Sequence, residues 1–150
     1  MTAYTGTITR EGRAGERGMQ FIALGKYALT GALVNADTIT WSNLLPDPNR
    51  FKVIGFRFWS PELDTDATPT ATIIVGDGTD TDAYLTTSNV GLPAQAPANG
   101  YQINLSGNGA AIGAAAGTAV SRNVVLTVNG VVATGATTGT LWVEFVCEAI

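Results

Sequence analysis

The sequence has no histidine and only one cysteine. Without histidine, the commonest general base, the commonest metal ligand and every imidazole-dependent catalytic triad are excluded. The single thiol, Cys147, cannot form a disulfide within the chain, and its place at the end of the apolar run 141–146 indicates a buried, unreactive side chain. A glycine-rich phosphate loop ending in Lys-Ser or Lys-Thr is also absent. The chain is therefore not expected to be an enzyme.

Charged residues are scarce as well. They make up 13% of the 150 residues, about half the usual share of a soluble domain, whereas hydrophobic residues make up 45%. This balance indicates that part of the surface is covered by other protein. The net charge is −4 and the basic residues are scattered along the chain, so no surface suited to phosphate groups is predicted and nucleic acid is not an expected partner.

Export and membrane signals are missing too. The N-terminal stretch Met-Thr-Ala-Tyr-Thr-Gly-Thr lacks the charged start and the apolar block of a signal peptide. No stretch approaches the ~20 consecutive apolar residues that are needed to cross a bilayer. We expect a soluble protein made in the cytoplasm, with no membrane partner and no cofactor.

The N-terminal segment differs from the rest of the chain. Residues 1–18 contain four glycines and too few apolar residues to anchor a core element. Charges of both signs alternate there and nearly cancel: Arg10, Glu11, Arg13, Glu16 and Arg17. Such a pattern is typical of a solvated segment. The sequence predicts a flexible N-terminal arm over 1–18, followed by a single domain over 19–150.

From residue 19 onward, short runs of β-branched and aromatic residues are separated by Gly, Pro, Asn and Asp, a pattern typical of many short strands. Eight segments carry it: 19–24, 27–33, 37–41, 51–60, 70–75, 101–105, 124–128 and 141–148. Asn129 and Gly130 indicate a tight turn, after which Val131 and Val132 could begin the returning strand of a hairpin. About eight strands and no helical period predict an all-β domain, a two-sheet sandwich of jelly-roll type.

Alternation along two of these strands predicts an outward-facing group. The inward set of strand 51–60 is Ile54, Phe56 and Phe58. The opposite set is Val53, Arg57 and Trp59. On strand 141–148, Trp142 takes the same outward position. Tryptophan and arginine dominate the energetics of protein interfaces, so we expect Arg57, Trp59 and Trp142 to contact a partner; the alternative is that a loop of the sandwich covers them.

Half of the twelve acidic residues lie between Glu62 and Asp82. Two carboxylates about 5 to 10 Å apart can hydrolyse glycosides, but these acids lie among Thr, Pro and Gly, with no aromatic sugar platform nearby. Asp77, Asp80 and Asp82 are oxygen ligands at short spacing, yet the spacing does not match the EF-hand loop. We expect a solvated acidic turn, with a weak calcium site at these three residues as the alternative.

Two stretches carry a family resemblance. They are Asn49-Arg-Phe-Lys-Val-Ile-Gly-Phe-Arg-Phe-Trp and, after an acidic Thr/Pro linker, Ala71-Thr-Ile-Ile-Val-Gly-Asp-Gly-Thr-Asp-Thr-Asp-Ala-Tyr-Leu. This pattern of two strands, a Gly-Asp turn and an Asp-Ala-Tyr-Leu segment resembles capsid decoration (cement) proteins of tailed bacteriophages. The resemblance covers residues 45–90 and concerns strands and turns rather than a site.

The resemblance implies a structural protein of the virion, made in the host cytoplasm and bound to the outer capsid surface. There it would bridge neighbouring major capsid proteins, as a homotrimer. The 1–18 arm would grip the shell, with Arg10, Arg13 and Arg17 meeting acidic groups of the capsid. The alternative is a tail-associated receptor- or carbohydrate-binding β-sandwich, in which Trp59, Tyr84, Tyr101 or the acidic loop recognises sugar on a host surface.

Overall fold

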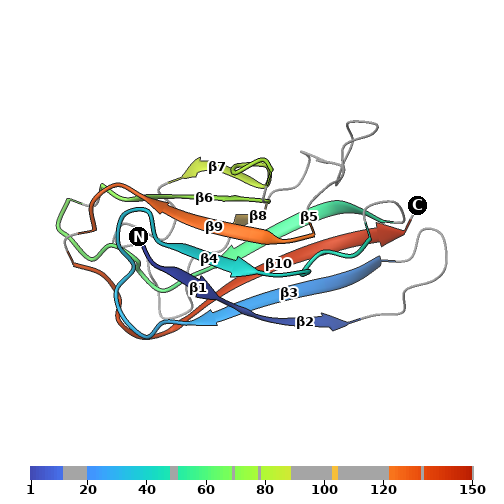
Figure 1. Cartoon of the computed structure of the whole chain (residues 1–150), viewed down its shortest axis with the longest axis horizontal. Helices are drawn as coiled ribbons and strands as arrows, with labels where there is room; N and C mark the ends of the chain where they lie inside the picture. Colours follow the sequence, from blue (N-terminus) through green and yellow to red (C-terminus); the bar gives the residue numbers. More distant parts are fainter. Residues whose placement is uncertain are drawn as a thin grey trace.

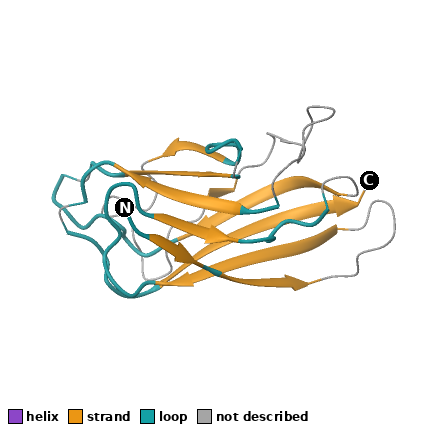
Figure 2. Ribbon diagram, viewed as in Figure 1, coloured by secondary structure: helices purple, strands orange, loops and turns teal. Residues whose placement is uncertain are grey.

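The computed structural model describes residues 1–11, 20–47, 51–68, 70–77, 79–88, 103–104, 122–132 and 134–149. These residues form strands joined by turns and loops, without a helix among them (Figures 1 and 2). The strands are β1 (Ala3–Thr5), β2 (Thr7–Glu11), β3 (Gln20–Ala28), β4 (Thr38–Trp41), β5 (Phe51–Trp59), β6 (Thr72–Gly76), β7 (Leu85–Ser88), β8 (Ile103–Asn104), β9 (Val124–Asn129) and β10 (Thr140–Ala149).

The ten strands make two five-stranded sheets that run along the long axis of the molecule (Figure 1). Sheet A has the order β1-β4-β9-β6-β7, and sheet B has the order β2-β3-β10-β5-β8. All pairings between these strands are antiparallel except that of β1 with β4, which is parallel. The predicted all-β, two-sheet sandwich is confirmed. Without β1 and β2, the orders β4-β9-β6-β7 and β3-β10-β5-β8 are compatible with a jelly roll.

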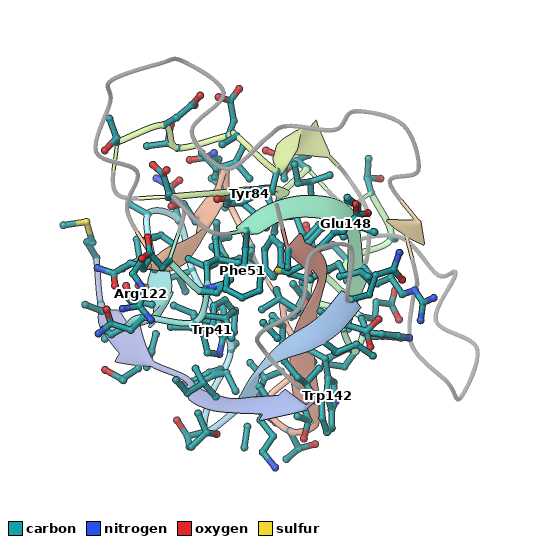
Figure 3. All side chains as sticks on the ribbon, turned by 90° about the vertical axis from the view of Figure 1, so that its right-hand side faces the viewer. Trp41, Phe51, Tyr84, Arg122, Trp142 and Glu148 are labelled. Carbon is teal, nitrogen blue, oxygen red and sulfur yellow. The ribbon has the colours of Figure 1, made fainter. Side chains whose placement is uncertain are left out.

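The core lies between the two sheets. Along β10 buried and half-buried residues alternate without a break, and the predicted inward set is fully buried: Leu141, Val143, Phe145 and Cys147. The ring centroid of Phe145 is 4.9 Å from that of Phe56, which is on the same sheet. It is also 4.9 Å from the ring centroid of Tyr84, which directly precedes β7 of sheet A, so one aromatic cluster joins the two sheets. Viewed along the strands, Trp41 and Phe51 lie between the sheets (Figure 3).

The predicted inward set of β5 is wrong at one position. Val146 of β10 is opposite Gly55, but the next residue, Cys147, is opposite Val53, so Ile54 is an extra residue in the ladder. A β-bulge of this kind reverses which residues face the core. Ile54 is therefore half-buried and Val53 is buried. The core side of β5 consists of Phe51, Val53, Phe56 and Phe58.

The predicted strand 19–24 and the first two residues of the predicted strand 27–33 belong to one strand, β3, which continues through Gly25 and ends at Ala28. Residues 29–33 are not part of a strand, so the second prediction is wrong over most of its length. Gly25 is not a turn residue here. A Cβ atom at this position would lie 2.8 Å from Val143 and 2.9 Å from Trp41. The glycine lets the Trp41 indole pack directly against the backbone of sheet B.

The hairpin predicted after β9 does not form. Gly130 does make a turn, with φ of +91°, and its N–H donates to Oδ1 of Asn35 at 2.9 Å. Val131 and Val132 are not part of a strand, and Val131 is 69% exposed. The neighbours of β9 are β4 and β6, and the next strand along the chain, β10, belongs to the other sheet.

Candidate interaction surfaces

The predicted outward residues of sheet B lie together. Trp142 on β10 is directly opposite Lys26 on β3 and opposite Trp59 on β5. The Lys26 ammonium nitrogen is 5.6 Å from the centroid of the Trp142 ring, within the range of a cation–π interaction. Both tryptophans are half-buried, and Figure 3 shows Trp142 on the outside of its sheet. The register thus joins two aromatic side chains from separate strands into one row.

A charged row lies next to the aromatic one. Glu144 is opposite Leu24 on β3 and Arg57 on β5. Nη1 of Arg57 is 3.1 Å from Oε1 of Glu144, and the two side chains are 46% and 12% exposed. The carboxylate is thus nearly covered while the guanidinium still reaches solvent. A guanidinium has five N–H donors, so Arg57 can pair with Glu144 and still offer donors to a partner.

The third row of this face is apolar. Ile22, which is 38% exposed, is opposite Val146, which is opposite Gly55. A Cβ atom at Gly55 would meet only Val146, at 3.5 Å or more, so the surface is open there. We call these three rows the aromatic face: Ile22, Leu24, Lys26, Gly55, Arg57, Trp59, Trp142, Glu144 and Val146. The sequence pattern does not single out Lys26 and Glu144, because only the strand register places them beside Trp142 and Arg57.

The outer face of sheet A has a different composition. Its outward residues on β1, β4, β6 and β9 are Ala3, Thr5, Thr38, Thr40, Thr72, Ile74, Val125, Thr127 and Asn129. None of these nine residues carries a charge. Thr127 is at the centre, opposite Thr38 on one side and Ile74 on the other. We call this surface the threonine face. In the sequence, the threonine face is indicated only by the alternation of threonine with apolar residues.

Within the segment predicted as an arm, residues 3–5 and 7–11 are paired in strands. β1 adds to the edge of sheet A and β2 to the edge of sheet B, so the chain crosses between the sheets at Gly6 (Figure 1). Gly6 donates its N–H to the carbonyl of Thr40 at 2.9 Å, and a side chain at Gly6 would overlap the indole of Trp41. The buried carboxylate of Asp37 accepts from the N–H of Thr2 at 2.6 Å.

Edge pairing needs few apolar side chains, because backbone hydrogen bonds hold the strand. This explains why composition alone indicated a free segment. Arg10 lies on β2 with its backbone opposite Ala23, whereas Arg13 and Arg17 lie outside the described residues, as does the predicted boundary between 18 and 19. Contact between these arginines and a shell stays a prediction.

The acidic turn has a structural role. Asp77 is buried, and its Oδ1 accepts from the backbone N–H groups of Thr79 at 2.6 Å and Asp80 at 2.7 Å, while Asp80 and Asp82 are exposed. Across the described residues, no three Asp, Glu or Cys side chains are grouped so that they could hold a metal ion.

Tyr84 is buried close to this turn. Its burial is the main cause that raises its pKa well above the usual range, and the negative charge of Asp77 is the second.

Asp64, in the linker before β6, is likewise structural. Its fully buried carboxylate accepts from the backbone N–H groups of Thr70 at 3.1 Å, Ala71 at 3.2 Å and Asp66 at 3.3 Å. These bonds fix the backbone where the chain enters β6 of sheet A.

Within the part of the chain that the structure describes, no helix has the length and apolar character to cross a membrane.

Similarity to known proteins is found among solved structures. No family model and no curated protein matches the sequence. Among solved structures, a chain of the Cyanophage Pam1 capsid asymmetric unit is 27% identical, with a TM-score of 0.63 over 93% of this chain and 91% of that one. A chain of the capsid of Ralstonia phage GP4 shares the fold, at 18% identity and a TM-score of 0.65 over 91% and 88%. The chain is related in structure to phage capsid proteins, and this likeness supports a structural, non-enzymatic role in a virion.

Proposed function

We propose that this protein binds the outside of a phage head and cements neighbouring major capsid proteins. The observation that carries the proposal is the nearly end-to-end match to a chain of a phage capsid asymmetric unit. The match covers 93% of this chain and 91% of that one, so the similarity extends along almost the whole of both chains. Such a domain acts through its surfaces, and the outer faces of the two sheets are two of them.

The aromatic face is the surface that we assign to the major capsid protein. Trp59, Trp142 and Arg57 are of the residue types that contribute most binding energy in interfaces. Trp142 lies within cation–π range of Lys26 and Arg57 pairs with Glu144, and such contacts restrict the side-chain rotamers before a partner binds. Side chains that are ordered before binding lose less conformational entropy when the partner arrives. The open apolar row beside them can receive an apolar side chain of the partner.

The end of β2 and the residues that follow it complete the proposed attachment. Arg10, Arg13 and Arg17 would meet acidic groups of the shell, and the paired strands β1 and β2 would fix where this segment leaves the domain. A homotrimer in this position binds the head through three copies of each surface. Multivalent attachment of this kind lets each single contact be weak.

The direct test uses purified protein and emptied, expanded heads of the phage that encodes it. We expect the protein to bind the heads and to raise their resistance to heat and dilution. Trp59→Ala and Trp142→Ala should each lower binding while the fold persists. Val131→Ala, which removes an exposed apolar side chain from a loop outside both faces, is the matched control. Heads that remain bare at saturating protein would contradict the proposal.

A second candidate function is carbohydrate binding, which the adjacent Trp59 and Trp142 favour because sugar rings stack on neighbouring aromatic side chains. Tyr84, which directly precedes β7, is not available for this role because it is buried with its ring against that of Phe145. Tyr101 lies outside the described residues. Labelled protein that ignores heads but binds host cells or glycans would favour this function over cementing.

A further inference from the structure

We infer that the surface of the major capsid protein that meets the aromatic face is acidic. Carboxylates of the shell pair with Lys26 and Arg57, and an apolar side chain between them covers Trp142. The inference rests on the proposed function, because it names the chemistry of the partner at the same surface.

The exposed charges of the protein are separated by sign. The net charge is −4, with 12 acidic and 8 basic residues. Among the described side chains, the exposed acids are Asp47, Asp80 and Asp82, and all three lie in loops. The exposed cations are Lys26 and Arg57, and both lie on the aromatic face. An acidic protein therefore presents a positively charged sheet surface.

The acid of the aromatic face does not cancel these cations. The Glu144 side chain is only 12% exposed, whereas that of its partner Arg57 is 46% exposed. Because a guanidinium has five N–H donors, the contact with Glu144 leaves others for a second carboxylate. Lys26 lies across β10 from Arg57, and its ammonium group contacts an uncharged ring, that of Trp142. The charge that reaches solvent on this face is therefore positive.

The adjoining positions of sheet B add charges of both signs in equal number. Glu148, on β10 beyond Val146, is opposite Lys52 on β5. The edge strand β2 contains one residue of each sign, Arg10 and Glu11. These neighbours leave the positive excess of the aromatic face unchanged.

The strand order gives the spacing of the matching groups. Lys26 on β3 and Arg57 on β5 flank β10, and neighbouring strands lie about 4.8 Å apart, so the two backbones are separated by roughly 10 Å. A matching partner has carboxylates about that far apart, with an apolar side chain between them. Two exposed cations on a protein of net charge −4 are too few to hold a nucleic acid, which requires many phosphate contacts.

The test measures association and dissociation rates of the purified protein with emptied, expanded heads. Salt is varied from about 0.1 to about 1 M, over which the Debye length shortens from about 10 to about 3 Å. We expect the association rate of the wild-type protein to fall with salt. Lys26→Met and Arg57→Gln should each slow association by roughly threefold to tenfold at the lower salt, because exposed interface charges act mainly on this rate.

Three further variants separate charge from other effects. Lys26→Arg keeps the charge and should associate like the wild type. Thr5→Glu, at an exposed position of the threonine face, lowers the net charge as much as Lys26→Met does and should also associate like the wild type. Trp142→Ala should mainly raise the dissociation rate. Circular dichroism checks the fold of each variant, and Lys26→Met decides alone if Arg57→Gln fails to fold.

The possible results distinguish this inference from the proposed function. Wild-type protein that binds heads at a rate independent of salt, with Lys26→Met equally fast, overturns the acidic surface and leaves cementing in place. Faster association of Lys26→Met would show that the partner surface is basic and would overturn it too. Heads that stay bare at saturating protein refute the proposed function, and the acidic shell surface with it. Protein that ignores heads but binds an anionic glycan would assign these cations to the second candidate function.

Discussion

The two outer faces of the sandwich follow the same strand geometry and yet differ in almost every chemical respect. On sheet B, aromatic, charged and apolar side chains form three rows, and the charges are engaged by neighbours within the chain, Lys26 over Trp142 and Arg57 on Glu144. On sheet A, threonines and small apolar residues cover the face without a charge. The inward residues of both sheets have to build one core, so they are alike. The outward residues are free of that requirement, so the two outer faces can differ in chemistry.

The largest expected effect separates the inner from the outer side of β10. Phe145 is fully buried in the aromatic cluster, so Phe145→Ala should lower the free energy of unfolding by about 3–5 kcal/mol. Trp142→Ala, on the outer side of the same strand, should lower it by about 1 kcal/mol. Urea unfolding followed by circular dichroism measures both. Equal losses would mean that Trp142 belongs to the core, and the contrast between the faces would lose its basis.

The next largest effect is expected at Gly6, where the chain passes from sheet A to sheet B. Gly6→Ala places a methyl group against the indole of Trp41, which has little freedom to move. Overpacking of this kind should lower the free energy of unfolding by about 1–3 kcal/mol. Gly31→Ala is the control, since a Cβ atom there would meet nothing within 4 Å. Identical melting temperatures for the two variants would show that β1 and β2 are not held as described.

A pH effect is expected at the edge of sheet A. Burial, followed by the Asp77 carboxylate, raises the pKa of Tyr84, so the folded phenol keeps its proton while the unfolded one ionises near pH 10. The folded state then holds more protons, and stability falls as the pH rises above about 10, until the folded phenol also ionises. Tyr84→Phe should flatten this alkaline decline. Parallel curves for both proteins between pH 9 and 11 would speak against a protonated, buried Tyr84.

The smallest effect sharpens the description of sheet B. Arg57 is half-exposed, so its pairing with Glu144 should contribute about 1 kcal/mol or less. A double-mutant cycle with Arg57→Ala and Glu144→Gln isolates this coupling energy, which should shrink as salt is added. Arg57→Ala alone should cost more than the coupling, because it leaves a nearly covered carboxylate without its partner. A coupling energy of zero would mean that the pair with Glu144 does not stabilise the fold.

Several errors of prediction have a common origin. The bulge at Ile54 is visible only in the register of β5 against β10, and it reverses the facing of Val53. Gly25 resembles a strand breaker in the sequence, but it serves the packing of Trp41 from the opposite sheet. Residues 1–11 contain little that is apolar, yet backbone pairing at two sheet edges holds them. In each case the deciding partner is distant along the chain.

Local sequence patterns are sufficient to predict the fold class, the alternating core of β6, β9 and β10, and the outward direction of Arg57, Trp59 and Trp142. These follow from the two-residue period of strands and the preference of β-branched residues for them. Which outward residues become neighbours cannot be predicted in this way, because it depends on strand order and register. The aromatic row, the Arg57–Glu144 pair and the uncharged face of sheet A each combine side chains from strands far apart in the chain. Their adjacency depends on register and strand order, which a jelly-roll-like topology sets through long-range pairing and not through local sequence.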